Sequence, residues 1–355
     1  MSRPPGHPAL APFGTTIFAT MSGLAVQHAA INLGQGFPDT DGPQEVLDAA
    51  KAAIDGGRNQ YPPGAGVPEL LEAVALHQKR FYGIEVDPGS EVLVTVGATE
   101  AIYSTILALV QPGDEVVTFE PYYDSYAASI ALAGGTRRTS MLRFPDFAVD
   151  EESLRAAFSP RTRLVLLNTP HNPTGKVFSR NEIELVCALA HEYDAWVVTD
   201  EVYEHLLFDG LTHIPVAGLP GMAERTLTIS SAGKTFSTTG WKVGWVSGPA
   251  EAIAAVRAVK QFVTYVGSGP FQPAVAAGLG LGDDVYAALS GSLQAKRDLL
   301  VDGLRTAGLT VSVPQGTYFV IADAAPLGAR DALEFCHDLP VRAGVVPGTG
   351  RDLAE

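Results

Sequence analysis

The sequence predicts an α/β fold in which a mostly parallel sheet lies between two layers of helices. Short apolar runs of strand character alternate with longer helical stretches, and this alternation is typical of parallel sheets with helical crossovers. The helical stretches include Glu100 to Val110, Asn181 to Glu192 and Ala250 to Phe262. The strand-like runs span 92–96, 115–119, 163–167, 195–199, 225–230 and 243–247.

The remainder of the chain predicts a smaller α+β region. Tyr286 to Thr306 reads as a long helix, and 309–313 and 318–321 are strand-like. The length of 355 residues suggests about two domains. We expect an N-terminal arm and part of a small domain at 1–42, a large domain at 43–285 that carries the functional site, and the small domain at 286–355.

Composition narrows the class of protein. The net charge of −15 argues against nucleic acid or an anionic membrane as a partner. No apolar run reaches membrane-spanning length, and Met1 to Ala11 lacks a secretory hydrophobic segment. Cys187 and Cys336 are too few for a disulfide framework, and the histidines show no metal-ligand spacing. These features predict a cytoplasmic protein without a metal site.

Lys234 is the first candidate for chemistry. It follows the strand-like run Leu227-Thr228-Ile229-Ser230 on a turn of small residues. A partly desolvated lysine can lose its proton and form a Schiff base with an aldehyde cofactor. Ser231 and Lys242 flank it and suit a phosphate. A P-loop is excluded because position 228, five before Gly233, is threonine rather than glycine. The alternative is an ordinary surface lysine after a strand.

Asp200 follows the apolar run 195–198 and would lie at a strand's carboxyl end. A carboxylate there can pair with the ring nitrogen of pyridoxal phosphate and keep it protonated. The alternative is a cap for a following helix. Tyr203 and Asn172 follow strand-like runs as well, and both can bond the ring oxygen of that cofactor. For Asn172, an ordinary Asn-Pro turn is the alternative.

Two further strand ends contribute candidates. Ala98 and Thr99 follow the run 92–96 at an expected helix start, where free backbone N–H groups bind anions. Tyr123 follows 115–119 and could stack on a flat ring. The alternative for Ala98 and Thr99 is an ordinary strand-to-helix turn. The alternative for Tyr123 is core packing, which is common for an aromatic residue at a strand end.

Several stretches together resemble the class I/II, fold-type I pyridoxal phosphate aminotransferases. The likeness runs from about Phe18 to about Phe335 and is strongest to the kynurenine aminotransferase, glutamine transaminase K and cysteine-conjugate β-lyase subgroup. Bacterial methionine and N-succinyldiaminopimelate aminotransferases are similar too. The matching stretches are Asn32 to Asp39, Asn59 to Pro62, Thr95 to Ala98, Asn168 to Gly175, Thr199 to Tyr203 and Ser230 to Trp245.

The resemblance implies a role for each matching residue. Lys234 would be the Schiff-base lysine and general base, with Asp200 and Tyr203 as the other catalytic residues. The cofactor's phosphate would be held by Ala98, Thr99, Ser231 and Lys242, and by Tyr61 of a neighbouring subunit. Tyr123 would stack on the ring. The substrate would contact Gly36, Asn172, Phe18 and Tyr265. The Glu120-Pro121 and Asn172-Pro173 bonds would be cis.

The implied activity is transfer of an amino group from an amino acid to a 2-oxo acid by a homodimer with shared active sites. Two alternatives stay open: β-elimination from cysteine conjugates, and a cofactor-binding protein with little catalysis. The second arises because relatives continue into a segment with an arginine that binds the substrate carboxylate. Arg342 and Arg351 do not match that arginine, so the small domain is expected to be incomplete and turnover slow.

Overall fold

The structure is a computed structural model that describes residues 6–13, 17–34, 36 and 38–348, and the side chains of 17–19 are outside that description. The helices are α1 (Ile17–His28), α2 (Gln44–Asp55), α3 (Pro68–Tyr82), α4 (Gly97–Leu109), α5 (Ser125–Leu132), α6 (Glu151–Ala157), α7 (Arg180–Glu192), α8 (Ala232–Thr235), α9 (Ala250–Lys260), α10 (Phe271–Leu279), α11 (Asp283–Thr306) and α12 (Ala332–Ala343). Short 3₁₀ turns lie at Pro8–Leu10, Val216–Gly218, Thr239–Trp241 and Ala325–Leu327.

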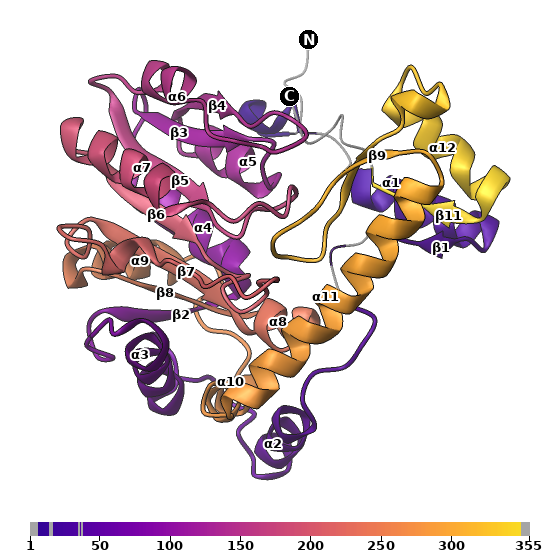
Figure 1. The fold of residues 1–355 in the computed structure, drawn as a ribbon. Coiled ribbons are helices and arrows are strands. Elements are labelled where there is room, and N and C mark those ends of the chain that lie inside the picture. The colour runs from indigo at the N-terminus through magenta and orange to yellow at the C-terminus, as the bar shows by residue number, and fades with distance from the viewer. Residues whose placement is uncertain (1–5, 14–16, 35, 37, 349–355) are drawn as a thin grey trace.

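The centre of the molecule is a seven-stranded sheet with the order β2-β8-β7-β6-β5-β3-β4 (Figure 1). Only β8 runs antiparallel to its neighbours, so the sheet is mostly parallel, as predicted. Its strands are β2 (Val92–Val96), β3 (Glu115–Glu120), β4 (Thr136–Met141), β5 (Thr162–Asn168), β6 (Trp196–Asp200), β7 (Thr226–Ser231) and β8 (Val243–Ser247).

Strand β4 is not predicted by the sequence. Strand β4 contains Thr136, Arg137, Arg138 and Thr139, and its side chains are mostly not buried. It lies at the edge of the sheet and pairs only with β3 among the described residues. Edge strands tolerate polar residues and charges, so β4 lacks the apolar signal by which the other strands were found.

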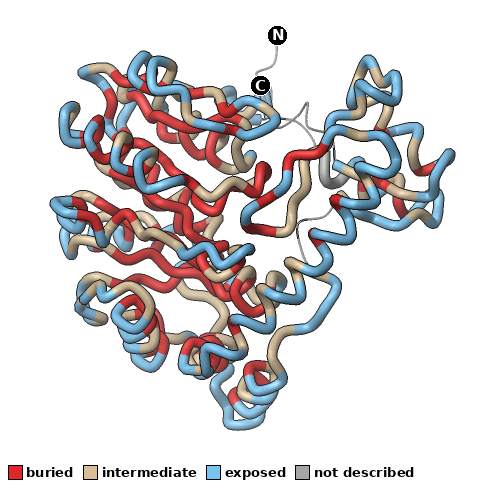
Figure 2. The backbone as a smooth tube through the Cα atoms, in the orientation of Figure 1, coloured by how far each residue is buried: buried red, intermediate tan, exposed pale blue. Residues whose placement is uncertain are grey.

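Helices cover both faces of the sheet, so the predicted three-layer arrangement is confirmed. In β5, Leu164 and Leu166 pack with α4, α5 and α9, whereas Val165 and Leu167 pack with α6 and α7. This division follows from the alternation of side chains along a strand. The buried parts of the chain in Figure 2 are concentrated in the sheet and in the helix faces toward it. Cys187 is buried in the second of these layers, as expected.

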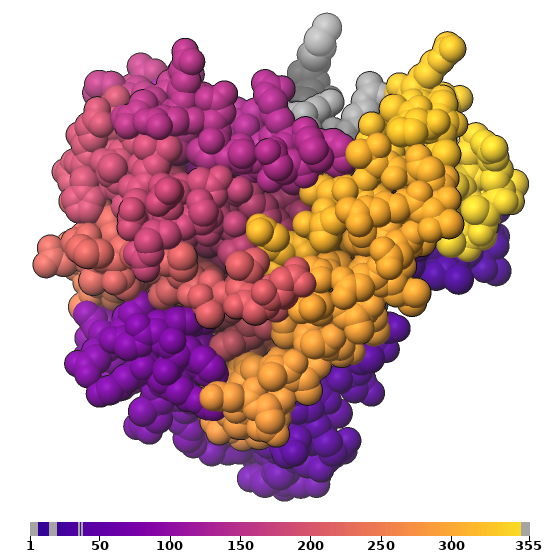
Figure 3. Space-filling model, in the orientation of Figure 1, coloured from indigo at the N-terminus to yellow at the C-terminus, as the bar shows by residue number. Residues whose placement is uncertain are grey.

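A smaller region lies beside the sheet and is reached through α11, which crosses the face of the molecule shown in Figure 3. It contains the parallel pair β1 (Ile31–Asn32) and β11 (Val345–Val346) and the antiparallel pair β9 (Thr310–Ser312) and β10 (Ile321–Asp323). Cys336 of α12 is buried with Met21 and Ala25 of α1. The domain boundaries at residues 42 and 285 remain predictions.

The second strand expected in this region is displaced. Tyr318 and Phe319 do not belong to a strand, because β10 begins only at Ile321. They lie on the loop between β9 and β10, which reaches from the smaller region toward the sheet (Figure 1). Among the described residues, no helix combines the length and the apolar character needed to cross a membrane.

Candidate active site

A cleft opens at the carboxyl ends of the central strands, where α/β sheets bind their ligands. It contains every predicted cofactor residue except Tyr61. The lining residues are Gly97, Ala98, Thr99, Ile102, Tyr123, Asn172, Asp200, Val202, Tyr203, Ser231, Gly233, Lys234, Thr239, Lys242 and Val243. The Glu120-Pro121 and Asn172-Pro173 bonds are both cis, as predicted, and so are Phe144-Pro145 and Thr169-Pro170.

Lys234 lies in α8, a single helical turn that directly follows the buried strand β7. The turn is tight because a Cβ on Gly233 would lie 3.1 Å from Thr239 Cα. Burial lowers the pKa of Lys234 to about 8; Asp200 opposes this shift and Lys242 adds to it. The lysine therefore lines the cleft and has an accessible neutral form, which is not the behaviour of an ordinary surface lysine.

Asp200 ends β6, the strand that runs parallel to β7. Its Oδ2 accepts a hydrogen bond of 2.6 Å from the Tyr126 hydroxyl, and its Oδ1 accepts one of 3.4 Å from the Val202 backbone N–H. Burial raises the pKa of Asp200 to about 6, against the effect of these donors. No helix begins within the described residues 201–215, so the helix-cap alternative is wrong.

The loops after β5 and β6 are tied together beside Asp200. Asn168 Nδ2 donates to the Asp200 carbonyl at 2.7 Å, and its Oδ1 accepts from the Asn172 backbone N–H at 2.6 Å. Asn172 lies in a turn, as its alternative interpretation held, and this turn lines the cleft. Burial raises the pKa of Tyr203 well above its ordinary value, so its hydroxyl stays a donor.

The opposite end of the cleft is built to bind an anion. Gly97 begins α4 with φ +71°, and a Cβ there would lie 3.1 Å from Lys242 Nζ. Lys242 itself has φ +55°. On β8, a Cβ on Gly244 would lie 2.5 Å from the Gly97 carbonyl carbon. Small residues thus let a lysine approach the amino terminus of a helix, where free N–H groups add to the positive field.

The groups that line the cleft suit the parts of pyridoxal phosphate. The cation and helix start fit its phosphate, and the buried Asp200 carboxylate fits a protonated ring nitrogen. Tyr123 lines the cleft between them, with its hydroxyl 3.3 Å from Thr99 Oγ1 and its ring edge-on to Tyr126 at 5.6 Å. The residues present therefore fit this cofactor.

The predicted substrate residues are only partly brought to the cleft, and Tyr61, predicted to reach the cofactor of a neighbouring subunit, is not part of it. The Gly36 carbonyl accepts a hydrogen bond of 3.0 Å from Lys234 Nζ. Tyr61 and Tyr265 lie outside the cleft, with 82% and 55% of their surfaces exposed and ring centres 5.7 Å apart. The side chain of Phe18 lies outside the described residues. Tyr318, which the sequence reading placed in a strand, bonds Lys234 Nζ at 2.6 Å.

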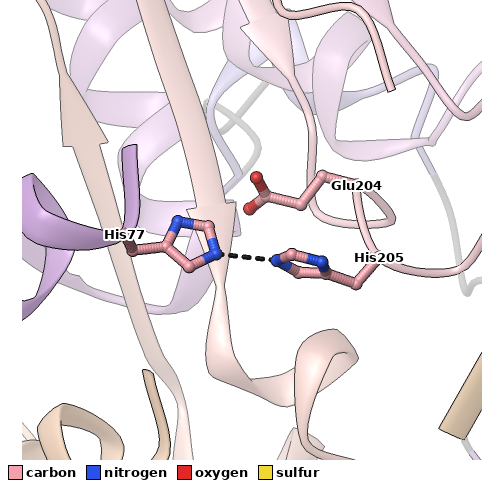
Figure 4. A group of neighbouring side chains, drawn as sticks. All are labelled: His77, Glu204 and His205. Carbon is pink, nitrogen blue, oxygen red and sulfur yellow. Dashed lines mark hydrogen bonds between the residues drawn. The ribbon is translucent and has the colours of Figure 1, made fainter. Parts of the chain in front are cut away.

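A second polar cluster lies near the cleft but outside it. His77, Glu204 and His205 have nitrogen and oxygen atoms within 4.8 Å of one another (Figure 4). The sequence showed no metal spacing here because α3 is far from β6 along the chain. His77 Nε2 bonds His205 Nε2 at 2.7 Å, and the Glu204 carboxylate accepts 2.6 Å bonds from Tyr82 and Ser230.

The contacts in this cluster favour a hydrogen-bond network over a metal site. The network joins α3 to the loop after β6 and to β7. Both Glu204 oxygens already accept a hydroxyl. His77 Nδ1 is buried without a partner, whereas a metal-bound histidine normally donates its second ring nitrogen to a neighbour. Burial lowers the pKa of both His77 and His205, that of His205 to about 4, which keeps both rings neutral near pH 7.

A half-buried lysine and a buried carboxylate lie at the ends of neighbouring parallel strands, beside a helix start that suits an anion. This arrangement suits an α/β enzyme that uses an aldehyde cofactor. The sequence model described as aminotransferase class I and II matches residues 29–351. The chain belongs to this family, and it is an amino-acid aminotransferase.

Its relatives act on different amino acids. A protein of Mycobacterium tuberculosis named as a probable N-succinyldiaminopimelate aminotransferase is 54% identical over 95% of this chain and 85% of its own length. The methionine aminotransferase of Escherichia coli is 44% identical, over 94% and 86%. Mouse kynurenine–oxoglutarate transaminase 3 is 40% identical, over 89% and 73%.

Solved structures agree on the fold. The N-succinyldiaminopimelate aminotransferase from M. tuberculosis superposes with a TM-score of 0.94 at 53% identity and covers 96% of this chain and 89% of its own. The aspartate aminotransferase from Thermus thermophilus with maleate has a TM-score of 0.92 at 33% identity, over 99% and 93%. The fold-type I assignment made from the sequence is confirmed.

Proposed function

We propose that the cleft binds pyridoxal 5′-phosphate on Lys234 and exchanges an amino group between an amino acid and a 2-oxo acid. One observation carries the proposal: Lys234, with a pKa lowered to about 8, shares a cleft with Asp200 of the neighbouring strand. A lysine that readily loses its proton can bond an aldehyde, and a buried carboxylate can hold a ring nitrogen protonated.

The bound cofactor supplies an aldehyde that reacts with amines and a ring that takes up negative charge. Asp200 would hold the proton on the ring nitrogen, and Asn172 and Tyr203 would bond the ring oxygen. The phosphate would be bound by Ala98, Thr99, Ser231 and Lys242, while Tyr123 covers the ring. The neutral amine of Lys234 would then take the proton from the α-carbon of the amino acid.

For the substrate, we propose N-succinyldiaminopimelate as the amino donor. The relative at 54% identity carries that name, against 44% and 40% for the methionine and kynurenine enzymes. The test is to measure kcat/KM for each of these three amino acids with 2-oxoglutarate as the amino acceptor. A preference for methionine or kynurenine would reject this substrate. Release of pyruvate from a cysteine conjugate would reveal the β-lyase alternative.

We also propose a homodimer. It is supported by the exposed aromatic side chains of Tyr61, Phe262 and Tyr265, with Phe262 86% exposed. The rings of Tyr61 and Tyr265 lie 5.7 Å apart, and exposed apolar surface is typical of protein interfaces. In the dimer, Tyr61 would reach the partner's cofactor phosphate. The cytoplasmic location stays a prediction from the sequence.

Lys234→Ala tests the attachment of the cofactor, because this variant should not form the bond to the cofactor that borohydride reduces. Wild-type protein incubated with pyridoxal phosphate should gain a visible absorption band, and borohydride should fix the cofactor on the peptide that contains Lys234. The control is Lys260→Met, because Lys260 is buried, does not line the cleft and donates to the carbonyls of Gly64 and Tyr265. Borohydride fixation on another lysine in wild-type protein would refute the proposal.

A further inference from the structure

Tyr318 makes contacts that give it a place beside the reacting amine. Its hydroxyl accepts a hydrogen bond of 2.6 Å from Lys234 Nζ and itself donates to the Gly36 carbonyl. Lys234 Nζ also donates to that same carbonyl, at 3.0 Å. The three groups therefore close a small ring of hydrogen bonds, although Gly36 and Tyr318 come from opposite ends of the chain.

We infer that Tyr318 is a positioning residue for the amine: together with the Gly36 carbonyl, it holds both N–H bonds of neutral Lys234 so that the lone pair is left for the cleft. The inference rests on the proposed function of Lys234. A neutral primary amine has two N–H donors and one lone pair. Two acceptors within 3.0 Å occupy both donors, so the remaining tetrahedral position is the nucleophilic one.

The hydroxyl of Tyr318 has no spare capacity for another role. It donates once, to Gly36, and accepts twice, from Lys234 and from the Tyr203 hydroxyl at 3.5 Å. A phenol offers one donor and two lone pairs, so these contacts use all of them. Burial raises the pKa of Tyr318. The phenol thus keeps its proton on the Gly36 side and presents its oxygen to the amine.

The backbone that carries Tyr318 is held in a strained conformation. Thr317 has φ +66°, which is a rare state for a β-branched residue, and it is fully buried. Its N–H donates to the Leu206 carbonyl at 2.9 Å. Strain of this kind persists only where the surroundings enforce it, and it is concentrated at functional sites.

The loop is anchored to the sheet on its other side as well. The N–H groups of Gln315 and Gly316 both donate to the Gly175 carbonyl, at 2.8 and 3.0 Å. A Cβ on Gly316 would lie 2.6 Å from the Leu206 carbonyl oxygen. Figure 2 shows the tip of this loop as buried where it meets the sheet. The position of Tyr318 is therefore fixed by the loops after β5 and β6, which also carry Asn172 and Tyr203.

The first test uses the cofactor-free full chain. Reductive methylation with formaldehyde is followed from pH 6 to 10, and the rate at Lys234 is read by peptide mass spectrometry. In wild type the midpoint should lie near pH 8. In Tyr318→Phe it should move to lower pH, because the variant loses an oxygen that stabilises the ammonium form. Lys260 in the same samples reports whether the fold is intact.

Tyr286→Phe is the matched control, since its hydroxyl lies outside the cleft and, within the part of the chain that the structure describes, hydrogen-bonds only the carbonyls of Gly278 and Leu279. Its Lys234 midpoint should equal that of wild type. An unchanged Lys234 midpoint in Tyr318→Phe, or the same change in Tyr286→Phe, would overturn the inference.

The second test is steady-state turnover of the cofactor-loaded enzymes. Loss of a positioning contact should lower kcat by about tenfold to a hundredfold, with KM changed much less. If wild type carries the cofactor on Lys234 but Tyr318→Phe keeps the wild-type kcat and midpoint, only the inference about Tyr318 fails. If the cofactor is not on Lys234, the proposed function fails, while the methylation midpoints still decide whether Tyr318 holds the amine.

Discussion

At the scale of single residues, the site depends on two ionisable groups that burial moves toward their neutral forms. Burial raises the pKa of Asp200 to about 6 and lowers that of Lys234 to about 8. Each shift suits a different task. The lysine becomes neutral at little cost near pH 8. Asp200 is buried, no cation among the described residues bonds to it, and it is matched to a positively charged ring nitrogen.

We predict that Asp200→Asn retains the cofactor but slows proton removal from the substrate. The charged hydrogen bond matters most while the ring takes up negative charge, and the phosphate contacts hold the cofactor in either case. By analogy with the loss of one charge-stabilising group, the barrier should rise by about 2 to 4 kcal/mol. Single-turnover kinetics with an α-deuterated amino acid would measure it. Near-normal turnover in a fully loaded variant would contradict the role of Asp200.

Without cofactor, Asp200→Asn should also change how the free energy of unfolding depends on pH. The folded-state pKa of Asp200 is raised from 3.8 to about 6, so the folded chain binds more protons than the unfolded chain in that window. This group therefore lowers wild-type stability as the pH rises from 4 to 6. Relative to wild type, Asp200→Asn should gain roughly 2 kcal/mol between pH 4 and pH 7. Urea unfolding at both pH values would show it, and a pH-independent difference would refute it.

At the scale of elements, the anion-binding end is made by the junction of β2 with α4 and by the strand β8 beside it. Gly97 allows the left-handed turn that begins α4, and Gly244 allows β8 to approach it. Both glycines act by lacking a Cβ, which makes room for a close approach. They bring Lys242 to the helix start, where the dipole and free N–H groups already attract an anion.

We predict that Gly97→Ala weakens cofactor binding by more than its cost in stability explains. A Cβ would lie 3.1 Å from Lys242 Nζ and push the cation from its place. Gly113→Ala is the matched control, because Gly113 also has positive φ but nothing within 4 Å of a Cβ. Both should lose about 1–2 kcal/mol of stability from the left-handed backbone. Only Gly97→Ala should raise the Kd for pyridoxal phosphate, and equal Kd values would contradict the prediction.

At the scale of the whole molecule, the cleft is completed by segments from both ends of the chain. Gly36 precedes the large sheet and Tyr318 follows it, yet both bond Lys234. The exposed surface of Tyr61, Phe262 and Tyr265 is not part of the lining of this cleft. A second copy of the chain on that surface is the arrangement by which Tyr61 would contribute to a site it does not reach within its own subunit.

We predict that Phe262→Asp shifts the protein from dimer to monomer and reduces cofactor retention. A charge placed on an apolar interface costs several kcal/mol of association unless it is paired. Leu299→Asp is the control, since Leu299 is 78% exposed on α11. Sedimentation velocity measures the oligomeric state of both variants, and visible absorbance measures the cofactor that they retain. A monomeric wild type, or a variant that stays dimeric at the same concentration, would reject the shared site.

The sequence by itself determined the sheet and most of the cleft, because both depend on local pattern. An apolar run ends where a polar residue begins, and in a parallel sheet the carboxyl ends meet at one edge. Lys234, Asp200, Asn172, Tyr123 and Thr99 could therefore be named from their positions after such runs. The polar strand β4 escaped because an edge strand needs no apolar run.

Only the tertiary structure decided which strand ends are neighbours and what else reaches them. The apolar run 318–321 suggested a strand. Tyr318 instead sits on a loop, because contacts of that loop with Gly175 and Leu206 set its course. His77 of α3 and His205 of the loop after β6 are likewise brought together only by the tertiary structure. The pKa values of Lys234 and Asp200 also belong to this level, since burial is a property of the assembled fold and not of any short stretch of sequence.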